Sequence, residues 1–474
     1  MKVVIAGSTG FIGKSLIASL NQDPRIEAIF ALSRSPRPAN ANEPKIVPRR
    51  SDLADLESVR KGVRGSTAAI YLVHSMSPQA RLDQGRFDDF DLHQADNFAR
   101  ACALENVERI FYLGGIIPAS SQNESKWSAH LRSRLEVERV LGTYGAITTS
   151  FRAGLVIGNG GSSSEMLIRL VRRLPVMLAP TWTQTRSEPV DLQDVVYAIH
   201  QTLFRPDLQN QSWDLTAEEV VSYRWLMQET AKLLGLRRSI IPVPVLSPGV
   251  SKLWVSTVSG APRALVYPLV KSLTYEMISR PDRRILPLLS KKPTSIHESL
   301  RRMASAPSSV PTAYRPKVEI LGARTVRSIQ RIPNIDSEKL KSIGSIAERY
   351  FEWLPRFLFK ILTVQKDQDA SNTRIRFLIR LTSIVLLELK SLSESGKVNE
   401  IFQIQGGLLK KKGTGGILEF RPIPSENCVL SIVQDFVPSL PWPVYRWTQA
   451  VIHLWVMNRF GNWISQSASI RSAP

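Results

Sequence analysis

The sequence contains little cysteine and no long uninterrupted apolar run. Its 474 residues include two cysteines, Cys102 and Cys428, which are far apart in the chain. Two distant thiols argue against a disulfide framework and favour a reducing compartment. No apolar stretch approaches the roughly 20 residues that a membrane-spanning helix needs. The segment Met1–Gly7 has the pattern of a strand that leads into a turn rather than of a secretory signal. We therefore expect a cytoplasmic protein.

Acidic residues are too few to balance the basic ones. The chain has 62 Lys and Arg against 41 Asp and Glu, which gives a formal net charge of +21. Such an excess indicates an anionic partner, either nucleic acid or an acidic membrane surface. The cations are scattered, however, and the densest run is Lys410–Lys412. Because no nucleic-acid-binding motif accompanies the charge, we expect no nucleic-acid partner. A membrane surface stays open as a partner but is not favoured.

The first part of the chain alternates short apolar runs with longer helical patterns. The run Ala68–His74 is continuously apolar, as is typical of a central strand that is buried on both faces. The alternation predicts an α/β fold with a doubly wound parallel sheet of the Rossmann type. The strand-like runs are residues 2–6, 27–33, 44–47, 68–74, 109–114 and 147–157.

The last hundred residues have a different pattern. Five strand-like runs separated by turn residues are followed by a helix that begins at Pro443. Leu418 and Phe420 alternate with charged neighbours, which is the period of a half-buried antiparallel strand. We therefore predict a separate α+β domain. Its strands are expected at 375–381, 384–392, 400–409, 416–421 and 429–437. The apolar face of its final helix is expected to consist of Val444, Trp447, Val451, Leu454 and Trp455.

A glycine-rich turn directly follows the first strand and opens the first helix. Glycine permits a tight turn and lets the backbone approach a pyrophosphate, while the helix N-terminus offers free N–H groups. In this context the pattern predicts a dinucleotide-binding turn; the alternative is a turn needed only for strand–helix packing. The candidate cofactor-binding residues are Gly7, Ser8, Thr9, Gly10, Phe11, Ile12 and Gly13.

The second strand ends without an acidic residue. Sites that prefer NAD usually place Asp or Glu there to hold the ribose 2′-hydroxyl. Here Ser33 and Arg34 occupy the position, and a guanidinium suits a 2′-phosphate. NADP is therefore favoured over NAD, the alternative being that Arg34 is an ordinary surface residue of a basic protein. Weaker candidates for cofactor contacts follow later strands, namely Asp52, Leu53, His74 and Ser75.

These segments together resemble the atypical short-chain dehydrogenase/reductases, and among them the NmrA-like, YbjT-like NAD(P)-binding branch. The resemblance rests on residues 7–13, 71–75, 111–115, 130–136 and 152–154. It covers about residues 1–304 and implies a Rossmann domain over 1–240 with a helical substrate lobe over 241–304. Residues 305–349 are predicted to be a linker. Residues 350–474 are similar to the START-like (helix-grip) region that some of these proteins carry.

The resemblance also implies a catalytic set from which this chain departs. Active short-chain dehydrogenases use a Tyr, a Lys four residues later, and a Ser or Thr after the fifth strand. The corresponding positions here are His130, Arg134 and Gly114–Gly115. Since an imidazole titrates near neutrality, His130 is a candidate proton relay with Arg134 beside it. The alternative is that neither residue transfers a proton.

Two functions stay open. One is an oxidoreductase that acts on a small apolar substrate, quinone-like or enal-like. The other is a non-catalytic NADP-binding sensor or assembly factor. In the tail, the tryptophans either line an apolar ligand site or belong to the core. They are Trp442, Trp447, Trp455 and Trp463. We expect no metal, and the sequence predicts no oligomeric state.

Overall fold

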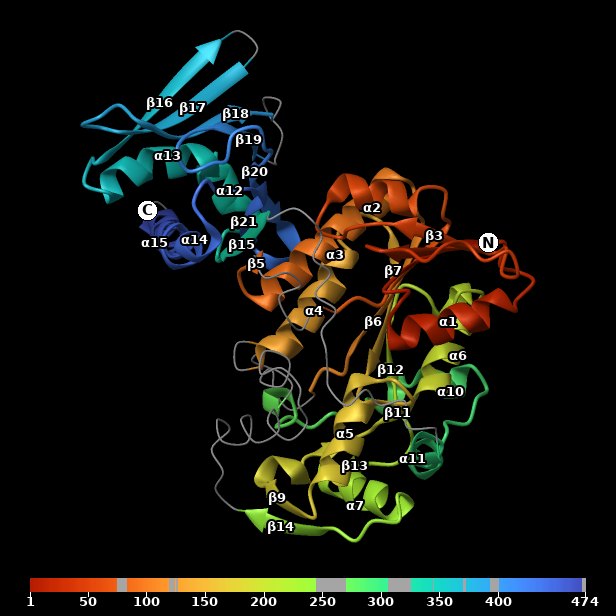
Figure 1. Ribbon diagram of the computed structural model, residues 1–474. Coiled ribbons are helices and arrows are strands. Elements are labelled where there is room, and N and C mark those ends of the chain that lie inside the picture. Colours follow the sequence, from red (N-terminus) through yellow and green to blue (C-terminus); the bar gives the residue numbers. More distant parts are fainter. Residues whose placement is uncertain are drawn as a thin grey trace. The chain divides into compact units, whose positions relative to one another are not determined.

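The computed structural model describes residues 1–74, 83–118, 124, 127–243, 270–305, 325–343, 345–369, 372–392 and 400–470. The chain forms two compact units (Figure 1). The first consists of residues 1–77 and 94–316, and the second of residues 78–93 and 317–474. Ser75, residues 244–269 of the predicted lobe and residues 306–324 of the predicted linker lie outside the described residues.

A seven-stranded sheet forms the centre of the first unit, in the order β12-β7-β6-β4-β1-β2-β3. Every neighbouring pair is parallel, which confirms the predicted Rossmann-type α/β fold. The predicted strand 68–74 is shorter in the structure, because β4 ends at Tyr71 and leaves His74 beyond the sheet. The strands are β1 (Lys2–Ala6), β2 (Ala28–Ser33), β3 (Ile46–Arg50), β4 (Ala68–Tyr71), β6 (Arg109–Gly115), β7 (Ile147–Ala153) and β12 (Ser212–Leu215).

Helices connect successive strands of this sheet. Polar side chains fix where some of them begin: Asp55, Ser128 and Asp191 each accept a hydrogen bond from a backbone N–H in the first turn. Buried aliphatic side chains on α1 and α6 pack with the central strands into one core. The helices are α1 (Phe11–Asn21), α2 (Leu56–Val63), α3 (Phe87–Leu104), α4 (Ala129–Leu141) and α6 (Leu192–Thr202).

A smaller subdomain follows β7 and builds its own cluster of buried residues, including Ile168, Leu226 and Leu300. The helices that contribute them lie both before and after residue 241, so this subdomain is larger than the predicted lobe 241–304. The predicted boundary between residues 240 and 241 falls inside β14, a strand that pairs with β9. The main elements are β8 (Val156–Ile157), α5 (Ser162–Arg173), β9 (Val176–Pro180), β10 (Arg186–Ser187), β11 (Val190–Asp191), β13 (Val221–Ser222), α7 (Tyr223–Leu233), β14 (Ser239–Val243), α10 (Ile285–Leu288) and α11 (Ile296–Ser305).

The second unit contains an eight-stranded sheet in the order β16-β17-β18-β19-β20-β21-β15-β5. Neighbouring strands are antiparallel except β15 and β5, which are parallel. All five predicted strands are present as β17 to β21. The strands are β5 (Asp83–Gln84), β15 (Val326–Ile332), β16 (Leu362–Asp369), β17 (Asn372–Ile379), β18 (Val385–Ser391), β19 (Glu400–Gly406), β20 (Ile417–Ile423) and β21 (Cys428–Phe436).

The predicted linker over 305–349 is partly wrong. This range contains β15, α12 (Ser337–Ile343) and the start of α13 (Ile346–Phe357). β15 is a full member of the sheet, and its residues Val326, Ile329 and Ile332 are buried. The strand is hard to recognise in the sequence because buried polar residues, Ser328 and Gln330, interrupt its apolar pattern.

The final helix buries a different face from the one predicted. The helical segment breaks at Thr448 into α14 (Trp442–Trp447) and α15 (Gln449–Ile470). Trp447 is 76% exposed and Val451 is 51% exposed. The break changes the helical phase, and apolar residues lie on all sides of α15, so periodicity alone misidentified the buried side. The buried side consists of Ala450, Val456, Met457, Phe460 and Ile464.

Helices α13 and α15 pack on one face of the second sheet (Figure 1). Their aromatic side chains share one core with the strands, which confirms the predicted α+β class. The likeness to START-like domains stays a prediction. Among the described helices, none has both the length and the apolar character needed to cross a membrane.

The corrected face of α15 gives a stability prediction. Phe460 is fully buried, with ring centroids 5.1 Å from Tyr350 and 5.4 Å from Trp353. Phe460→Ala should lower the free energy of unfolding of the second unit by about 3–5 kcal/mol. The control Trp447→Ala should change it by less than about 0.5 kcal/mol, because that side chain is exposed. Chemical denaturation of the full chain measures both; equal losses would contradict the assignment.

Candidate cofactor site

The turn between β1 and α1 brings two glycines into contact. Gly7 has a φ of +88°, in the left-handed region that favours glycine. A Cβ at Gly13 would lie 2.2 Å from the Gly7 carbonyl oxygen, so no side chain fits there. The N-cap of α1 is Gly10, which has no side chain to cap the helix. The first N–H groups of α1 are therefore left for a ligand, as in other anion-binding helix N-termini.

Other residues of this turn fix it to the surrounding structure. The buried Ser8 hydroxyl donates a hydrogen bond of 2.7 Å to the carbonyl oxygen of Leu32 in β2. The ring of Phe11 packs against the loop after β8, where a Cβ at Gly161 would lie 3.0 Å from it. Ile12 packs against the core, and Thr9 is exposed. Thr9 is thus the residue of the turn whose side chain is most accessible.

Basic side chains gather at the ends of β2 and β3. Because these strands are parallel, Ser33 of β2 lies opposite Arg50 of β3. Arg34 follows Ser33, and Arg37 is exposed nearby in the chain. In the part of the chain that the structure describes, no ion pair involves Arg34, Arg37 or Arg50. Sequence reasoning missed Arg50; the only signal for it is its position at the end of the adjacent strand.

Asp52 and Leu53 come directly after β3. The Asp52 carboxylate accepts a hydrogen bond of 3.1 Å from the N–H of Ala54. The Leu53 carbonyl oxygen accepts one of 2.9 Å from the side-chain amide of Asn97 on α3. Asn97 is fully buried and positions this loop. It was not predicted, since nothing in its local sequence connects it with residues so far away in the chain.

One face of α4 crosses the carboxyl ends of three strands. His130, Arg134 and Glu138 are spaced four residues apart and therefore lie on the same side of the helix. His130 contacts His74 after β4. Arg134 lies beside Gly115 of β6, where an added Cβ would be 3.7 Å from the Arg134 Cγ. Glu138 forms an ion pair with Arg152 of β7. The structure thus brings together the predicted residues His74, His130 and Arg134.

His74 and His130 form a hydrogen-bonded pair, with 3.1 Å between His74 Nε2 and His130 Nδ1. Burial lowers the pKa of both imidazoles well below 6.5, and the nearby Arg134 charge lowers each further. The two rings also oppose each other's protonation. The pair is therefore neutral near pH 7, with one ring nitrogen donating and the other accepting. A charged His130 that delivers a proton is disfavoured by this environment.

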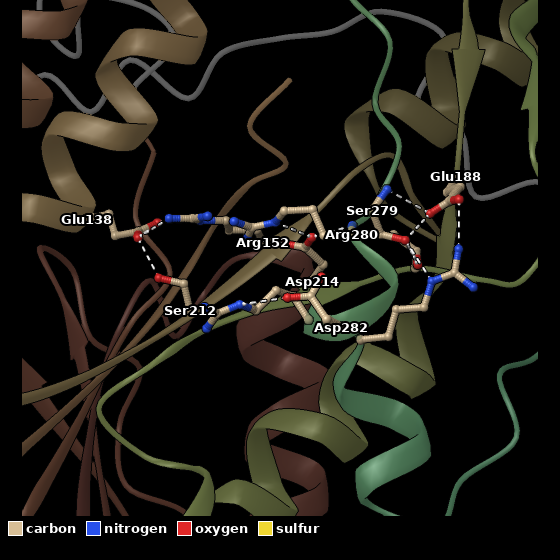
Figure 2. Close-up of polar contacts among 11 residues, drawn as sticks. Glu138, Arg152, Glu188, Ser212, Asp214, Ser279, Arg280 and Asp282 are labelled. Carbon is tan, nitrogen blue, oxygen red and sulfur yellow. Dashed lines mark hydrogen bonds and ion pairs between the residues drawn. The ribbon is translucent and has the colours of Figure 1, made fainter. Parts of the chain in front are cut away.

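Two sets of polar contacts surround the segment 279–284: the first joins it to β12, and the second joins it to the loop between β10 and β11 (Figure 2). In the first set, Glu138 accepts hydrogen bonds from Arg152, at 2.6 Å, and from the Ser212 hydroxyl, at 2.8 Å. Beside Arg152 in the sheet lies Asp214, which accepts a 2.9 Å bond from the Arg280 N–H. Asp214 also forms an ion pair with the Arg280 side chain.

In the second set, the fully buried Glu188 accepts hydrogen bonds from Ser279 and, at 2.9 Å, from Arg284 (Figure 2). Buried carboxylates that are paired in this way are costly to disrupt. Each carboxylate of the two sets, Glu138, Asp214 and Glu188, already has a basic partner. We therefore assign Asp214 and Glu188 to holding the segment 279–284 in place, and Glu138 to joining α4 with β7 and β12, rather than to proton transfer.

Comparisons with known proteins agree with this geometry. Residues 3–213 match the NAD dependent epimerase/dehydratase family. The match agrees with the NAD(P)-binding Rossmann fold predicted for these residues, whereas the NmrA-like branch and the START-like region stay predictions. The auxiliary protein GraX of Staphylococcus aureus is 29% identical over 114 residues, which are 24% of this chain and 36% of GraX. The match thus spans about a third of that relative.

Solved structures also resemble the first unit. A nucleoside-diphosphate-sugar epimerase from Staphylococcus aureus aligns with a TM-score of 0.50 at 15% identity, covering 64% of this chain and 100% of that one. An NADPH-dependent quinone oxidoreductase from Escherichia coli, in complex with NADPH, has a TM-score of 0.49 at 17% identity over 63% of this chain and 98% of its own. At 15% identity the likeness to the first of these structures shows the fold alone.

The neutral histidine pair gives a pH prediction. In the folded chain the pKa values of His74 and His130 lie below 6.5. Between these values and pH 6.5 the unfolded chain therefore binds protons that the folded chain does not. The pair's contribution to stability is complete above pH 6.5 and is lost as pH falls towards the folded pKa values. The free energy of unfolding should therefore decrease below pH 6.5, by at most about 1.4 kcal/mol per pH unit for each histidine.

Denaturation curves at a series of pH values measure this slope. The double variant His74→Asn/His130→Asn should have a shallower slope than the wild type, even if its overall stability is lower. The control His297→Asn removes an exposed histidine and should leave the slope unchanged. An unchanged slope in the double variant would contradict the lowered pKa values.

Proposed function

We propose that the first unit binds NADP(H) in preference to NAD(H) and acts as a reductase of small apolar acceptors. The observation that carries the cofactor preference is the set of cations, Arg34 and Arg50, at the ends of β2 and β3. Within the described residues, no carboxylate forms an ion pair with either of them. A guanidinium at this position favours a 2′-phosphate, whereas the carboxylate of an NAD site would repel it.

A dinucleotide fits the turn after β1. The Gly7–Gly13 contact keeps side chains out of the backbone surface, and α1 begins without a side-chain cap. In this proposal the residues of the turn hold the pyrophosphate, Arg34 holds the 2′-phosphate, and Asp52–Leu53 border the adenine. His74 lies after β4, on the side where the nicotinamide is expected. Bound NADPH supplies a hydride.

The residues around His130 restrict which acceptors can be reduced. A neutral imidazole pair is a poor proton donor, and Gly114–Gly115 offer no hydroxyl to polarise a carbonyl. Reduction of an ordinary ketone needs a proton at the developing alkoxide. Hydride transfer to a quinone, or to the β-carbon of an enal, instead gives an anion that is stabilised by delocalisation. Such an anion can take its proton from water. The neutral pair therefore favours quinone-like or enal-like acceptors. His130 and Arg134 then act by orienting the ligand.

The cofactor preference can be measured by fluorescence titration of the purified chain with NADPH and NADH. We expect NADPH to bind at least about tenfold more tightly, since a charge-assisted contact contributes about 1.5–3 kcal/mol. Arg34→Asp should abolish this preference by weakening NADPH binding. The control Arg237→Asp makes the same charge change at an exposed position in the first unit and should leave the preference intact. Equal affinities in the wild type would overturn the proposal.

The acceptor class can be tested by following NADPH oxidation with menadione, an α,β-unsaturated aldehyde and cyclohexanone. We expect turnover with the first two acceptors and none with the unactivated ketone. His130→Asn should lower the rate less than about tenfold, because loss of a true general acid costs about 10²–10⁴-fold. Arg34→Asp, assayed at the same NADPH concentration, measures the background. Rapid reduction of cyclohexanone that is lost in His130→Asn would show that His130 is the proton donor.

A second candidate function is a non-catalytic NADP-binding sensor or assembly factor. It is favoured by the neutral histidine pair, which departs from the usual proton-transfer set. The partial match to a protein described as auxiliary agrees with it. NADPH binding with the predicted preference, but no oxidation with any acceptor, would support this candidate over the reductase.

A further inference from the structure

One end of the second sheet exposes a group of large apolar side chains, which we call the apolar rim. They belong to three turns: the turn between α13 and β16, the turn between β17 and β18, and the segment after β19. Side chains of this size are usually buried, and their gathering at loop tips marks a surface for interaction. The members of the rim and their exposed fractions are Phe359 89%, Ile361 66%, Leu381 94%, Ile384 44% and Leu408 59%.

The pairing of the strands places these three turns at the same end of the sheet. The first residue of β16, Leu362, lies opposite the last residue of β17, Ile379. The Arg380 N–H donates a 2.9 Å hydrogen bond to the Ile361 carbonyl oxygen, which joins the first two turns. The Leu408 N–H donates one of 2.9 Å to the carbonyl oxygen of Val385, which joins the third. The rim is thus a continuous edge rather than a set of scattered residues.

The backbone holds Phe359 outward in a conformation that bulky residues avoid. Phe359 and Lys360 have φ values of +51° and +57°. Both are held by hydrogen bonds to the end of α13, from Phe359 N–H to Arg356 O and from Lys360 N–H to Pro355 O. Such left-handed non-glycine residues are strained and concentrate at functional positions. An exposed phenyl ring contributes little to folding, so this strain is not explained by stability of the unit.

The charged residues within the three turns themselves are all basic. Residues 355–361, 379–384 and 407–416 contain no Asp or Glu. Five of the six basic side chains in these ranges are exposed, and within the described residues none of the five forms an ion pair. By contrast Lys410 is buried, and its Nζ donates to the Gln405 carbonyl oxygen at 3.1 Å. The exposed cations are Arg356, Lys360, Arg380, Lys411 and Lys412.

An exposed tryptophan adjoins this edge. Trp455 of α15 is 46% exposed, and its ring centroid lies 4.8 Å from that of Phe357, two residues before Phe359. Tryptophan is enriched at the boundary between lipid and water, where one part of its ring is apolar and another is polar.

We propose that the apolar rim docks the protein onto an anionic lipid bilayer. Phe359, Ile361 and Leu381 enter the acyl boundary, and the surrounding cations contact the negative headgroups. This combination of shallow apolar insertion and positive charge is what peripheral membrane binding requires. A protein partner would more often need mixed charge complementarity, and acidic residues are absent from these turns. The proposal depends on the second unit alone and not on the function proposed for the first.

Flotation of the full chain with lipid vesicles tests the proposal. Vesicles of phosphatidylcholine alone should retain little protein, and vesicles with about one third phosphatidylglycerol should retain most of it. Binding should weaken severalfold in 1 M salt, where the Debye length falls to about 3 Å. Equal binding to both vesicles would show that negative headgroups are not recognised and would overturn the proposal.

Variants separate docking by the rim from adsorption by net charge. Phe359→Asn/Leu381→Asn removes the apolar tips, and asparagine tolerates the left-handed backbone at position 359. Lys360→Glu/Arg380→Glu reverses two rim charges. Each should lower the vesicle partition coefficient at least about tenfold. The matched controls in the first unit are Leu104→Asn and Arg237→Glu/Lys292→Glu, which should bind like the wild type. Unchanged thermal unfolding confirms that each variant is folded.

Two further results would overturn the proposal. If the charge controls weaken binding as much as the rim variants do, the protein adsorbs through its overall charge of +21. Alternatively, sedimentation without vesicles could show self-association that the Phe359→Asn/Leu381→Asn variant abolishes, while vesicles retain no protein. In that case the rim is an interface between two copies of the chain.

Discussion

The contact between Gly7 and Gly13 is the constraint on which the cofactor site depends. The Gly7 carbonyl oxygen leaves no space for a side chain at Gly13, so α1 begins directly at the end of β1. This places the N-terminus of the helix at the carboxyl edge of the sheet. The adjacent strand ends then bring Arg34 and Arg50 to the same edge. In the proposed site, this backbone contact sets where a phosphate would bind, and the strand order sets which charges would surround it.

The contacts at this edge of the sheet also explain why α4 carries no protonated imidazole that could act as an acid. His130 lies where the helix meets the end of β4, and its neighbour there is another imidazole. Burial and the Arg134 charge keep both rings neutral, so the position keeps hydrogen bonding but loses easy proton delivery. A hydride acceptor that forms a stabilised anion avoids this deficit. The choice between reductase and sensor therefore rests on the acceptor.

Local sequence patterns predicted most helices and strands, but they could not predict contacts between segments that are distant in the sequence. The glycine turn, six strands of the first sheet and five strands of the second follow from periodicity and turn residues. The pairing of His74 with His130 depends on two loops that meet only in the folded sheet. Arg50 was missed because it acts through strand register rather than through a motif. The face of α15 was wrong because a break at Thr448 shifts the helical phase, which no apolar count reveals.

The buried carboxylates of the first unit and the exposed cations at the apolar rim differ in whether they have a partner of opposite charge. In the first unit, buried carboxylates such as Glu188 and Asp214 are each satisfied by an arginine, and these pairs hold the fold together. In the second unit, the cations beside Phe359 and Leu381 have no acidic neighbours in their turns. Unpaired cations on a folded surface repel one another, and large exposed apolar groups cost free energy in water. An anionic bilayer offsets both costs at once, whereas a neutral bilayer offsets only the cost of the exposed apolar groups.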